Sequence, residues 1–181
     1  MLIPKVTSET TLSNSFLGST KQVCVVSRDI YRTMDGLIKL GIGPWRVYTF
    51  SPETCTDVIY RSKPSTHSMR LSLATSGDML WEVIQPLEGP SIYTEFLDQH
   101  GEGIHHVAPL CEGLTYDQQV SKFESLGYRS IQSGTWQGVV PFSYFETEGD
   151  ISTTLEIFDI PEDYDLPEPE EWYPAAPPEA A

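Results

Sequence analysis

The sequence predicts an α+β protein made of two halves that follow the same order of strand, helix and three further strands. Three observations support this prediction. Short apolar segments with the two-residue period of a strand recur at corresponding places in both halves. A segment with helical spacing of apolar residues follows the first strand of each half. Each half also closes on an apolar strand with a Glu at its centre, which indicates an internal duplication of pattern more than of identity.

The elements of the first half follow from apolar spacing and from residues that start or stop a helix. Residues 21–26 form a short apolar run and predict a strand. Asp29 stands where an N-cap would, and apolar residues then recur at helical spacing to about Leu40, where Gly41 ends the helix. Residues 45–50 alternate as a strand does.

The first half continues with a predicted hairpin. Residues 68–74 and 79–85 form its strands, and the sequence Ser-Gly-Asp at 76–78 forms its turn. Ser91 is placed to cap a helix that links the two halves.

The second half repeats this order. An apolar strand is predicted at 104–110, and a helix is predicted at 116–126, which Gly127 ends. The three remaining strands are predicted at 128–133, 140–147 and 153–159.

We expect three parts in the chain: an N-terminal arm at 1–18, a body at 19–160 and an acidic, proline-rich tail at 161–181. The body divides into a first module at 19–100 and a second at 101–160.

Composition limits the classes of partner. The net charge of −15 argues against binding to nucleic acid or to anionic membranes, because both attract Lys and Arg. Seven acids lie in residues 161–181, where Trp172 and Tyr173 can anchor the tail on the body or on a partner protomer. No stretch approaches the length of an apolar membrane span. The three cysteines form no CxxC, and Cys24 and Cys111 lie in apolar runs, so we expect reduced, buried thiols and a cytoplasmic location.

Two carboxylates stand out because of their apolar surroundings. Glu82 is the only ionisable residue in the run Trp-Glu-Val-Ile at 81–84, and Glu156 lies between Leu and Ile. A buried carboxylate is costly unless a cation, a proton or hydrogen bonds compensate it. Gln22 and His106 lie at corresponding places in the first strands of the two halves. If the halves face each other, Gln22, Glu82, His106 and Glu156 converge on one divalent cation, and we expect Mg, Mn, Co, Ni or Zn there.

Simpler interpretations exist for each residue taken alone. A Glu in an apolar strand pairs with Lys or Arg about as often as it binds metal, and a His-His dipeptide is usually structural or solvated. The four residues in duplicated register are the stronger argument for a metal site.

The chain resembles the vicinal oxygen chelate superfamily, which includes glyoxalase I, bleomycin-resistance proteins, extradiol dioxygenases and methylmalonyl-CoA epimerase. The likeness is greatest to the epimerase-like, glyoxalase-type branch and runs from about Lys21 to Pro161. Its most specific residues are Trp-Glu-Val-Ile-Gln-Pro at 81–86 through Glu-Phe-Leu-Asp-Gln-His-Gly-Glu-Gly-Ile-His-His-Val-Ala at 95–108, with Gly-Ile-Gly-Pro-Trp at 41–45.

The resemblance implies paired βαβββ modules that form a cupped, open mixed β-sheet around a metal. By position, Gln22 matches the first metal ligand, where His is more usual, and Glu82, His106 and Glu156 match the other three. The metal chelates neighbouring substrate oxygens and stabilises an enolate, while Glu156 or Glu82 carries the proton. His105 is a further catalytic candidate, although strand alternation would point it to the opposite face from His106.

Five residues near the expected cup are candidates for substrate binding. Either arginine can bind an anionic substrate group or pair with a structural acid, and the aromatic residues can line an apolar pocket. The five candidates are Trp45, Arg46, Tyr48, Arg70 and Tyr144.

These features predict a metal-dependent isomerase or epimerase, or a related lyase, that moves a proton beside a carbonyl of a small oxygenated acid, thioester or other metabolite. The alternative is a non-catalytic protein of the same fold that sequesters a hydrophobic small molecule. An extradiol-type dioxygenase is disfavoured, because the single His ligand departs from a two-His-one-carboxylate iron site. We expect a small-molecule substrate and a homodimer.

Overall fold

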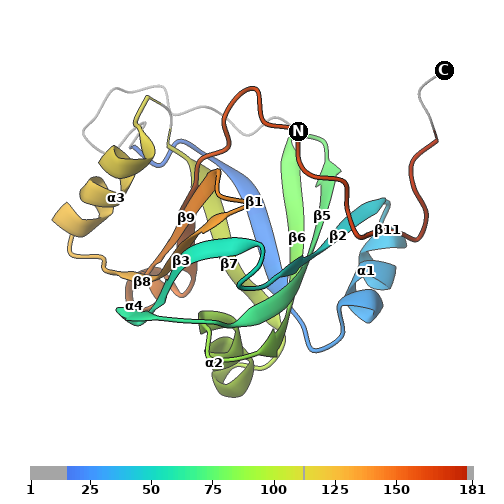
Figure 1. Cartoon of the computed structure of the whole chain (residues 1–181), viewed down its shortest axis with the longest axis horizontal. Coiled ribbons are helices and arrows are strands. Elements are labelled where there is room, and N and C mark those ends of the chain that lie inside the picture. Colours follow the sequence, from blue (N-terminus) through green and yellow to red (C-terminus); the bar gives the residue numbers. More distant parts are fainter. Residues whose placement is uncertain (1–15, 112, 179–181) are drawn as a thin grey trace.

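The computed structural model describes residues 16–111 and 113–178, and in this part of the chain eleven strands form one mixed sheet. The α+β prediction is confirmed. Figure 1 shows the sheet curving around an interior, with helices on its outside and at one end. The predicted arm at 1–18 lies outside the described residues except for its last three. The strand order is β11-β2-β5-β6-β1-β7-β10-β9-β8-β3-β4.

The two predicted βαβββ halves are present and pair within one chain. The first half consists of β1 (Ser19–Val26), α1 (Ile30–Ile38), β2 (Trp45–Phe50), β5 (Ser68–Ser76) and β6 (Met79–Glu88). The second half consists of β7 (Gly103–Leu110), α3 (Tyr116–Ser125), β8 (Ser130–Trp136), β9 (Val140–Phe145) and β10 (Thr154–Phe158). Helix α2 (Ile92–Gln99) links them, and the short α4 (Glu148–Ile151) precedes β10.

The halves join through their first strands. Strands β1 and β7 pair antiparallel, while β6 pairs parallel to β1 and β10 pairs parallel to β7. The four central strands are therefore β6, β1, β7 and β10, and each carries one of the four predicted metal ligands.

The helices begin where the sequence places their caps. The Asp29 side chain accepts a hydrogen bond from the backbone N–H of Arg32 at the start of α1, and Ser91 does the same for Thr94 at the start of α2. Helix α3 begins with a full capping box, in which Thr115 and Gln118 satisfy each other's backbone N–H groups.

Alternation of side chains along the strands separates an outer core from an inner one. On the outer face, α1 packs Ile30 and Met34 against Trp45, Val47 and Val83. Likewise, α3 packs Phe123 against Phe145, Leu155 and Ile157 of the second half. The inner face holds the largest cluster, which also includes Ile92, Tyr93 and Leu97 of α2.

Two strands beyond the repeat bring the ends of the sheet together. Strand β3 (Cys55–Tyr60) pairs with β8 of the second half, and β4 (Lys63–Pro64) pairs with β3. Only residues 51–54 separate β3 from β2, so the two edges of the sheet lie close and the cup becomes nearly a barrel. Phe50 of β2 accordingly stacks on Trp136 of β8, with ring centroids 5.2 Å apart.

The acidic segment after residue 160 packs on the body of its own chain. It contains β11 (Glu171–Tyr173), which pairs antiparallel with β2 and lies beside α1 (Figure 1). The Tyr173 hydroxyl donates to Asp35 of α1 at 2.7 Å, and the Arg46 guanidinium lies 4.7 Å from the centre of the Trp172 ring. Trp172 and Tyr173 are thus the anchors that the sequence indicates.

The helices of the described residues include none that is long and apolar enough to cross a membrane.

Candidate metal centre

The four predicted ligands meet on the inner face of the sheet. His106 Nε2 lies 3.0 Å from Glu82 Oε2 and 3.1 Å from Glu156 Oε2. Gln22 Nε2 lies 2.7 Å from Glu156 Oε2, 3.2 Å from Glu82 Oε2 and 3.3 Å from His106 Nε2. All four side chains are buried, and none exceeds 6% exposure. We call these four residues the quartet.

The local sequence explains why the polar members of each strand turn inward. Val83, next to Glu82, packs in the outer core under α1, and Leu155 and Ile157, on either side of Glu156, pack under α3. Because neighbouring residues of a strand point to opposite faces, both carboxylates face the interior. The apolar partners on the helix side thus orient the glutamates.

Electrostatics ties the quartet into one unit. Burial by itself would lower the pKa of His106, but Glu156 and Glu82 outweigh that effect and raise it to about 9. Burial raises the pKa of Glu156, and the nearby Glu82 carboxylate adds to this, while His106 works in the opposite direction. The metal-free centre therefore retains at neutral pH a proton that an exposed imidazole would release.

The donor set fits a divalent cation. Neighbouring ligand atoms around an octahedral ion with bonds of about 2.1 Å stand about 3.0 Å apart, which is close to the 3.0 and 3.1 Å between His106 and the two carboxylates. The Gln22 amide points its NH₂ group at the other three donors. To act as a ligand it must turn over and present Oε1, since only the oxygen has a lone pair to offer.

The structure adds Cys24 to this neighbourhood, which the sequence reasoning assigned to the core. Cys24 lies two residues after Gln22 on β1, so both face inward. Its thiol is fully buried, and its sulfur lies within 4.8 Å of donor atoms of Glu82 and His106. Burial, followed by the charge of Glu82, raises the pKa of this thiol well above its usual value. In the sequence, the spacing of two residues between Gln22 and Cys24 is the feature that indicates that both side chains take the same face of the strand.

His105 lies on the inner side with His106, contrary to the expectation from strand alternation. The register between β1 and β7 shifts after the Cys24–His106 pair, so that Val25 lies opposite Ile104, and His105 is the extra residue of this irregularity. The His105 ring is buried between Tyr93 and Phe96 of α2. Its Nδ1 atom lies 2.8 Å from Nδ1 of His106, so it holds that imidazole with Nε2 toward the carboxylates.

Two of the five predicted substrate-binding residues, Trp45 and Arg70, lie on the outer face of the sheet, away from the quartet. Trp45 is fully buried in the outer core, where its Nε1 donates to the Ile42 carbonyl. Arg70 also faces outward and donates to the Tyr31 hydroxyl of α1 at 2.8 Å. In both cases strand parity explains the outcome: Tyr48, three residues after Trp45, takes the inner face, and so do Met69 and Leu71 on either side of Arg70.

The other three candidates lie on the inner side. Tyr144 is next to the quartet, with its ring centre 5.0 Å from that of His106. Tyr48 donates to the Pro167 carbonyl at 3.0 Å, and Arg46 lies over Trp172, so both contact the C-terminal segment.

A pocket opens from the quartet into the interior of the sheet. Gln22, Glu82 and Glu156 form its polar end, and ten apolar side chains form its wall. The wall comes from both halves and from the C-terminal segment. Its residues are Phe50, Leu71, Leu73, Leu80, Trp136, Val140, Phe142, Phe158, Ile160 and Leu166.

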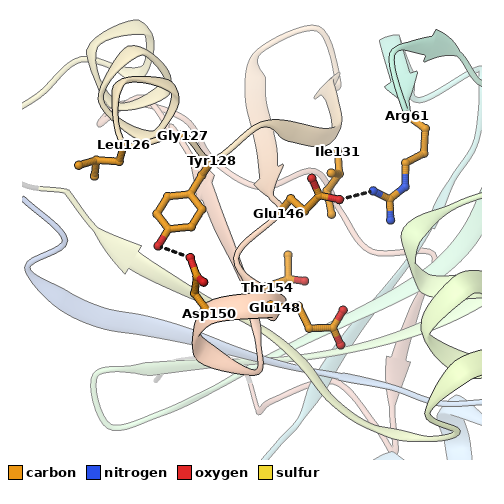
Figure 2. A pocket seen from close by; sticks show the side chains of 10 residues that line it. Arg61, Leu126, Gly127, Tyr128, Ile131, Glu146, Glu148, Asp150 and Thr154 are labelled. Carbon is orange, nitrogen blue, oxygen red and sulfur yellow. Dashed lines mark hydrogen bonds and ion pairs between the residues drawn. The ribbon is translucent and has the colours of Figure 1, made fainter.

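A second hollow lies on the surface between α4 and the end of β9, and no member of the quartet lines it. Figure 2 shows its polar groups already paired with one another, Tyr128 with Asp150 and Arg61 with Glu146. Glu148 is also paired, with His100. The chemistry of the quartet therefore belongs to the inner pocket and not to this hollow.

Two βαβββ halves with a buried carboxylate–imidazole centre at their junction define the class of this protein. The chain belongs to the glyoxalase/bleomycin resistance protein/dioxygenase superfamily, whose profile matches residues 21–142. No curated protein sequence matches the chain in a direct comparison. The family resemblance expected from the sequence is confirmed.

Solved structures with a similar fold include methylmalonyl-CoA epimerases. Methylmalonyl-CoA epimerase from Mycobacterium tuberculosis superposes with a TM-score of 0.61 at 15% identity, over 83% of this chain and 94% of that one. A variant of methylmalonyl-CoA epimerase from Streptomyces coelicolor, in complex with 2-nitronate-propionyl-CoA, gives 0.58 at 15% identity, over 78% and 93%. At this identity the likeness establishes the shared fold.

Proposed function

We propose that this protein is a metal-dependent isomerase or epimerase, or a related lyase, that moves a proton at a carbon beside a carbonyl. The observation that supports this most is the convergence of Gln22, Glu82, His106 and Glu156 at one buried point. Family membership agrees with it. A divalent cation held by these residues would supply Lewis-acid stabilisation for negative charge that develops on substrate oxygens.

Each residue of the centre has a task in this proposal. Glu82 and Glu156 both line the pocket, so either carboxylate can reach a substrate carbon there. Glu156 is the carboxylate that we test first as the proton carrier, since it also lies beside Gln22 and His106 at the polar end of the pocket. His105 acts as a positioning residue through Nδ1 of His106.

A non-catalytic protein that sequesters a hydrophobic molecule is the second candidate. The ten apolar side chains of the pocket wall favour this function, since such a surface binds apolar ligands without any chemistry. Metal content and proton exchange distinguish the two functions.

The test is a metal analysis joined to a proton-exchange assay. Wild type, His106→Ala and Glu156→Gln are exposed to mixed divalent ions, and bound metal is measured by elemental mass spectrometry. Each protein is then screened for solvent-deuterium exchange beside the carbonyl of small diketones, keto acids and thioesters. His100→Ala is the matched control, because that imidazole is exposed and bonded to Glu148.

We expect near-stoichiometric metal in wild type and in His100→Ala, and loss of metal in His106→Ala. Glu156→Gln should lose exchange by about 10²–10⁴-fold even at saturating metal. Absence of metal from all of the proteins would overturn the Lewis-acid mechanism. Metal binding without exchange on any of these carbonyl compounds would favour the sequestering protein.

A further inference from the structure

The residues that form the wall of the inner pocket indicate which kind of substrate fits there. All ten of its non-quartet residues are aliphatic or aromatic, and the described residues contribute no Lys or Arg to it. A carboxylate moved from water to such a wall loses its hydration and gains no partner, which is unfavourable. A substrate therefore fits best when the part of it that extends away from the metal centre, along the wall, is uncharged.

Charge at the polar end adds to this selectivity. Glu82 and Glu156 are the two carboxylates of the pocket, and together they offset the charge of a divalent cation. A loaded centre is then neutral overall and exerts no long-range attraction on an anion. The net charge of −15 over the chain adds repulsion at a distance.

Two arginines of the first half that the sequence indicates as candidates for anion binding have other partners. Arg70 donates to Tyr31 on the outer face of the sheet. Arg46 lies over the Trp172 ring at the junction of β2 and β11. Neither lines the pocket, so neither stands ready to neutralise a substrate carboxylate there.

The C-terminal segment completes the apolar wall. Ile160 and Leu166 both line the pocket, and Tyr164 and Leu166 pack against the inner core. Leu166 is only half-buried, which places it at the rim. The segment is held there by the bond from Tyr48 to the Pro167 carbonyl and by Glu170, which accepts from the backbone and hydroxyl of Thr49 at 2.8 Å.

We propose that the substrate is a small compound with two neighbouring oxygens at one end and an uncharged hydrocarbon group at the other, which lies against the wall closed by Leu166. This inference rests on the proposed function for the chelating end only. It excludes compounds that carry a free carboxylate away from the chelating oxygens.

The experiment compares two compounds that share a dione end and are otherwise matched in shape. In 6-methylheptane-2,3-dione the far end is an isopropyl group, and in 4,5-dioxohexanoate it is a carboxylate. Binding of each to zinc-loaded full-length protein is measured by isothermal titration calorimetry. We expect the uncharged dione to bind at least about tenfold more tightly.

Two variants test whether the wall sets this preference. Leu166→Arg at the rim and Leu80→Arg on β6 each place a cation in the wall, and both should shift the preference toward the carboxylate by about tenfold or more. Leu40→Arg, which adds the same charge at an exposed residue outside the pocket, should leave the preference unchanged. Circular dichroism establishes that each variant is folded, and two positions are used so that one misfolded variant does not decide the result.

Equal or weaker binding of the uncharged dione by wild type, or no binding of either compound, would overturn the inference. So would folded arginine variants that keep the wild-type preference. Binding is measured without turnover, so a protein that prefers the uncharged dione but shows no proton exchange would contradict the proposed function alone. Exchange on a carboxylate substrate bound as tightly as the dione would contradict this inference alone.

Discussion

His106 occupies the centre of the site at the scale of single residues. Its Nε2 contacts both carboxylates, and its Nδ1 contacts His105 of the same strand, so one ring joins the inner face of β7 to β6 and β10. Its raised pKa means that a proton competes with a metal for Nε2. Protonation of His106 should therefore weaken metal binding even at pH values well above the ordinary pKa of an imidazole.

Metal affinity should depend on pH up to about 9. Binding displaces the His106 proton, so the apparent Kd for zinc should fall by about tenfold per pH unit between pH 7 and 9 and level off above that. Competition with a chelator at pH 7, 8 and 9 measures this. His106→Gln, a ligand without a titrating proton, should flatten the slope. A wild-type affinity that does not change over this range would contradict the assignment.

The free energy of unfolding of the metal-free protein should fall as pH rises, whereas metal affinity should increase. A raised folded-state pKa stabilises the fold below the unfolded value of about 6.5, and that contribution is lost as pH rises through about 9. Urea denaturation in the presence of a chelator should show this loss in wild type and a smaller one in His106→Gln.

Cys24 should contribute to the binding of thiophilic ions at the metal centre but not to the binding of Mg. A bound thiophilic ion lowers the pKa of a thiol and can take it as a ligand. We expect cobalt-loaded wild type to show a thiolate-to-cobalt charge-transfer band in the near ultraviolet. Cys24→Ser should lack this band, and its affinity for zinc should be about tenfold lower. Cys111→Ser, a buried thiol in the outer core, is the control. Identical spectra of wild type and Cys24→Ser would exclude the sulfur from the metal.

The quartet could be predicted because its members lie in duplicated strands with clear apolar neighbours, as Glu82 and Glu156 do. His105 could not, because a single-residue irregularity in β7 reverses which face it takes. The face that Arg70 takes could not be predicted for a related reason: residues 68–74 alternate, but alternation alone does not say which face lies under a helix. Such assignments depend on packing between segments far apart in the chain.

At the scale of elements, the packing of the Phe142 ring of β9 over β8 depends on a glycine. A Cβ added at Gly134 would lie 2.9 Å from Cζ of Phe142 and 3.2 Å from Cγ2 of Val58. Gly134→Ala should therefore push the Phe142 ring, a wall of the pocket, and destabilise the protein by about 1–3 kcal/mol in urea denaturation.

Gly36→Ala is the matched control for this substitution. Gly36 lies within α1, and a Cβ added there meets no atom within 4 Å. That change should be neutral or should stabilise the protein by up to about 1 kcal/mol. Equal effects of the two substitutions would contradict the role given to Gly134.

The elements of the repeat could be predicted from sequence, and the closing strands could not. The predicted strand at 45–50 agrees with β2, and the predicted helices begin where their caps lie. Residues 55–60 have two exposed positions followed by three half-buried ones, so β3 shows no period of two. β11 lies in a segment rich in Pro and acids, and it becomes a strand only because the edge of β2 is available to it.

At the scale of the whole molecule, the C-terminal segment contributes to stability as well as to the pocket. Deletion of residues 162–181 removes β11 and the packing of Tyr164 and Leu166. We expect the melting temperature to fall by more than about 5 °C, since a loss of about 2–3 kcal/mol shifts a protein of this size by several degrees. Glu162→Gln, an exposed acid of the same segment, should leave it unchanged. An unaltered melting temperature after the deletion would contradict the packing role.

Each half of the sheet is finished by a strand that the other part of the chain supplies. β3, from the first half, extends the second through β8, and β11, which follows the second half, extends the first through β2. Two fragments cut at residue 100 would each display an unpaired edge, so neither is a self-contained folding unit. Separating the halves would require both exchanged strands to detach at once. The spacing of the donors on β1, β6, β7 and β10 is therefore protected by the cooperativity of the entire chain, and slow global unfolding rather than local opening should limit hydrogen exchange at the junction.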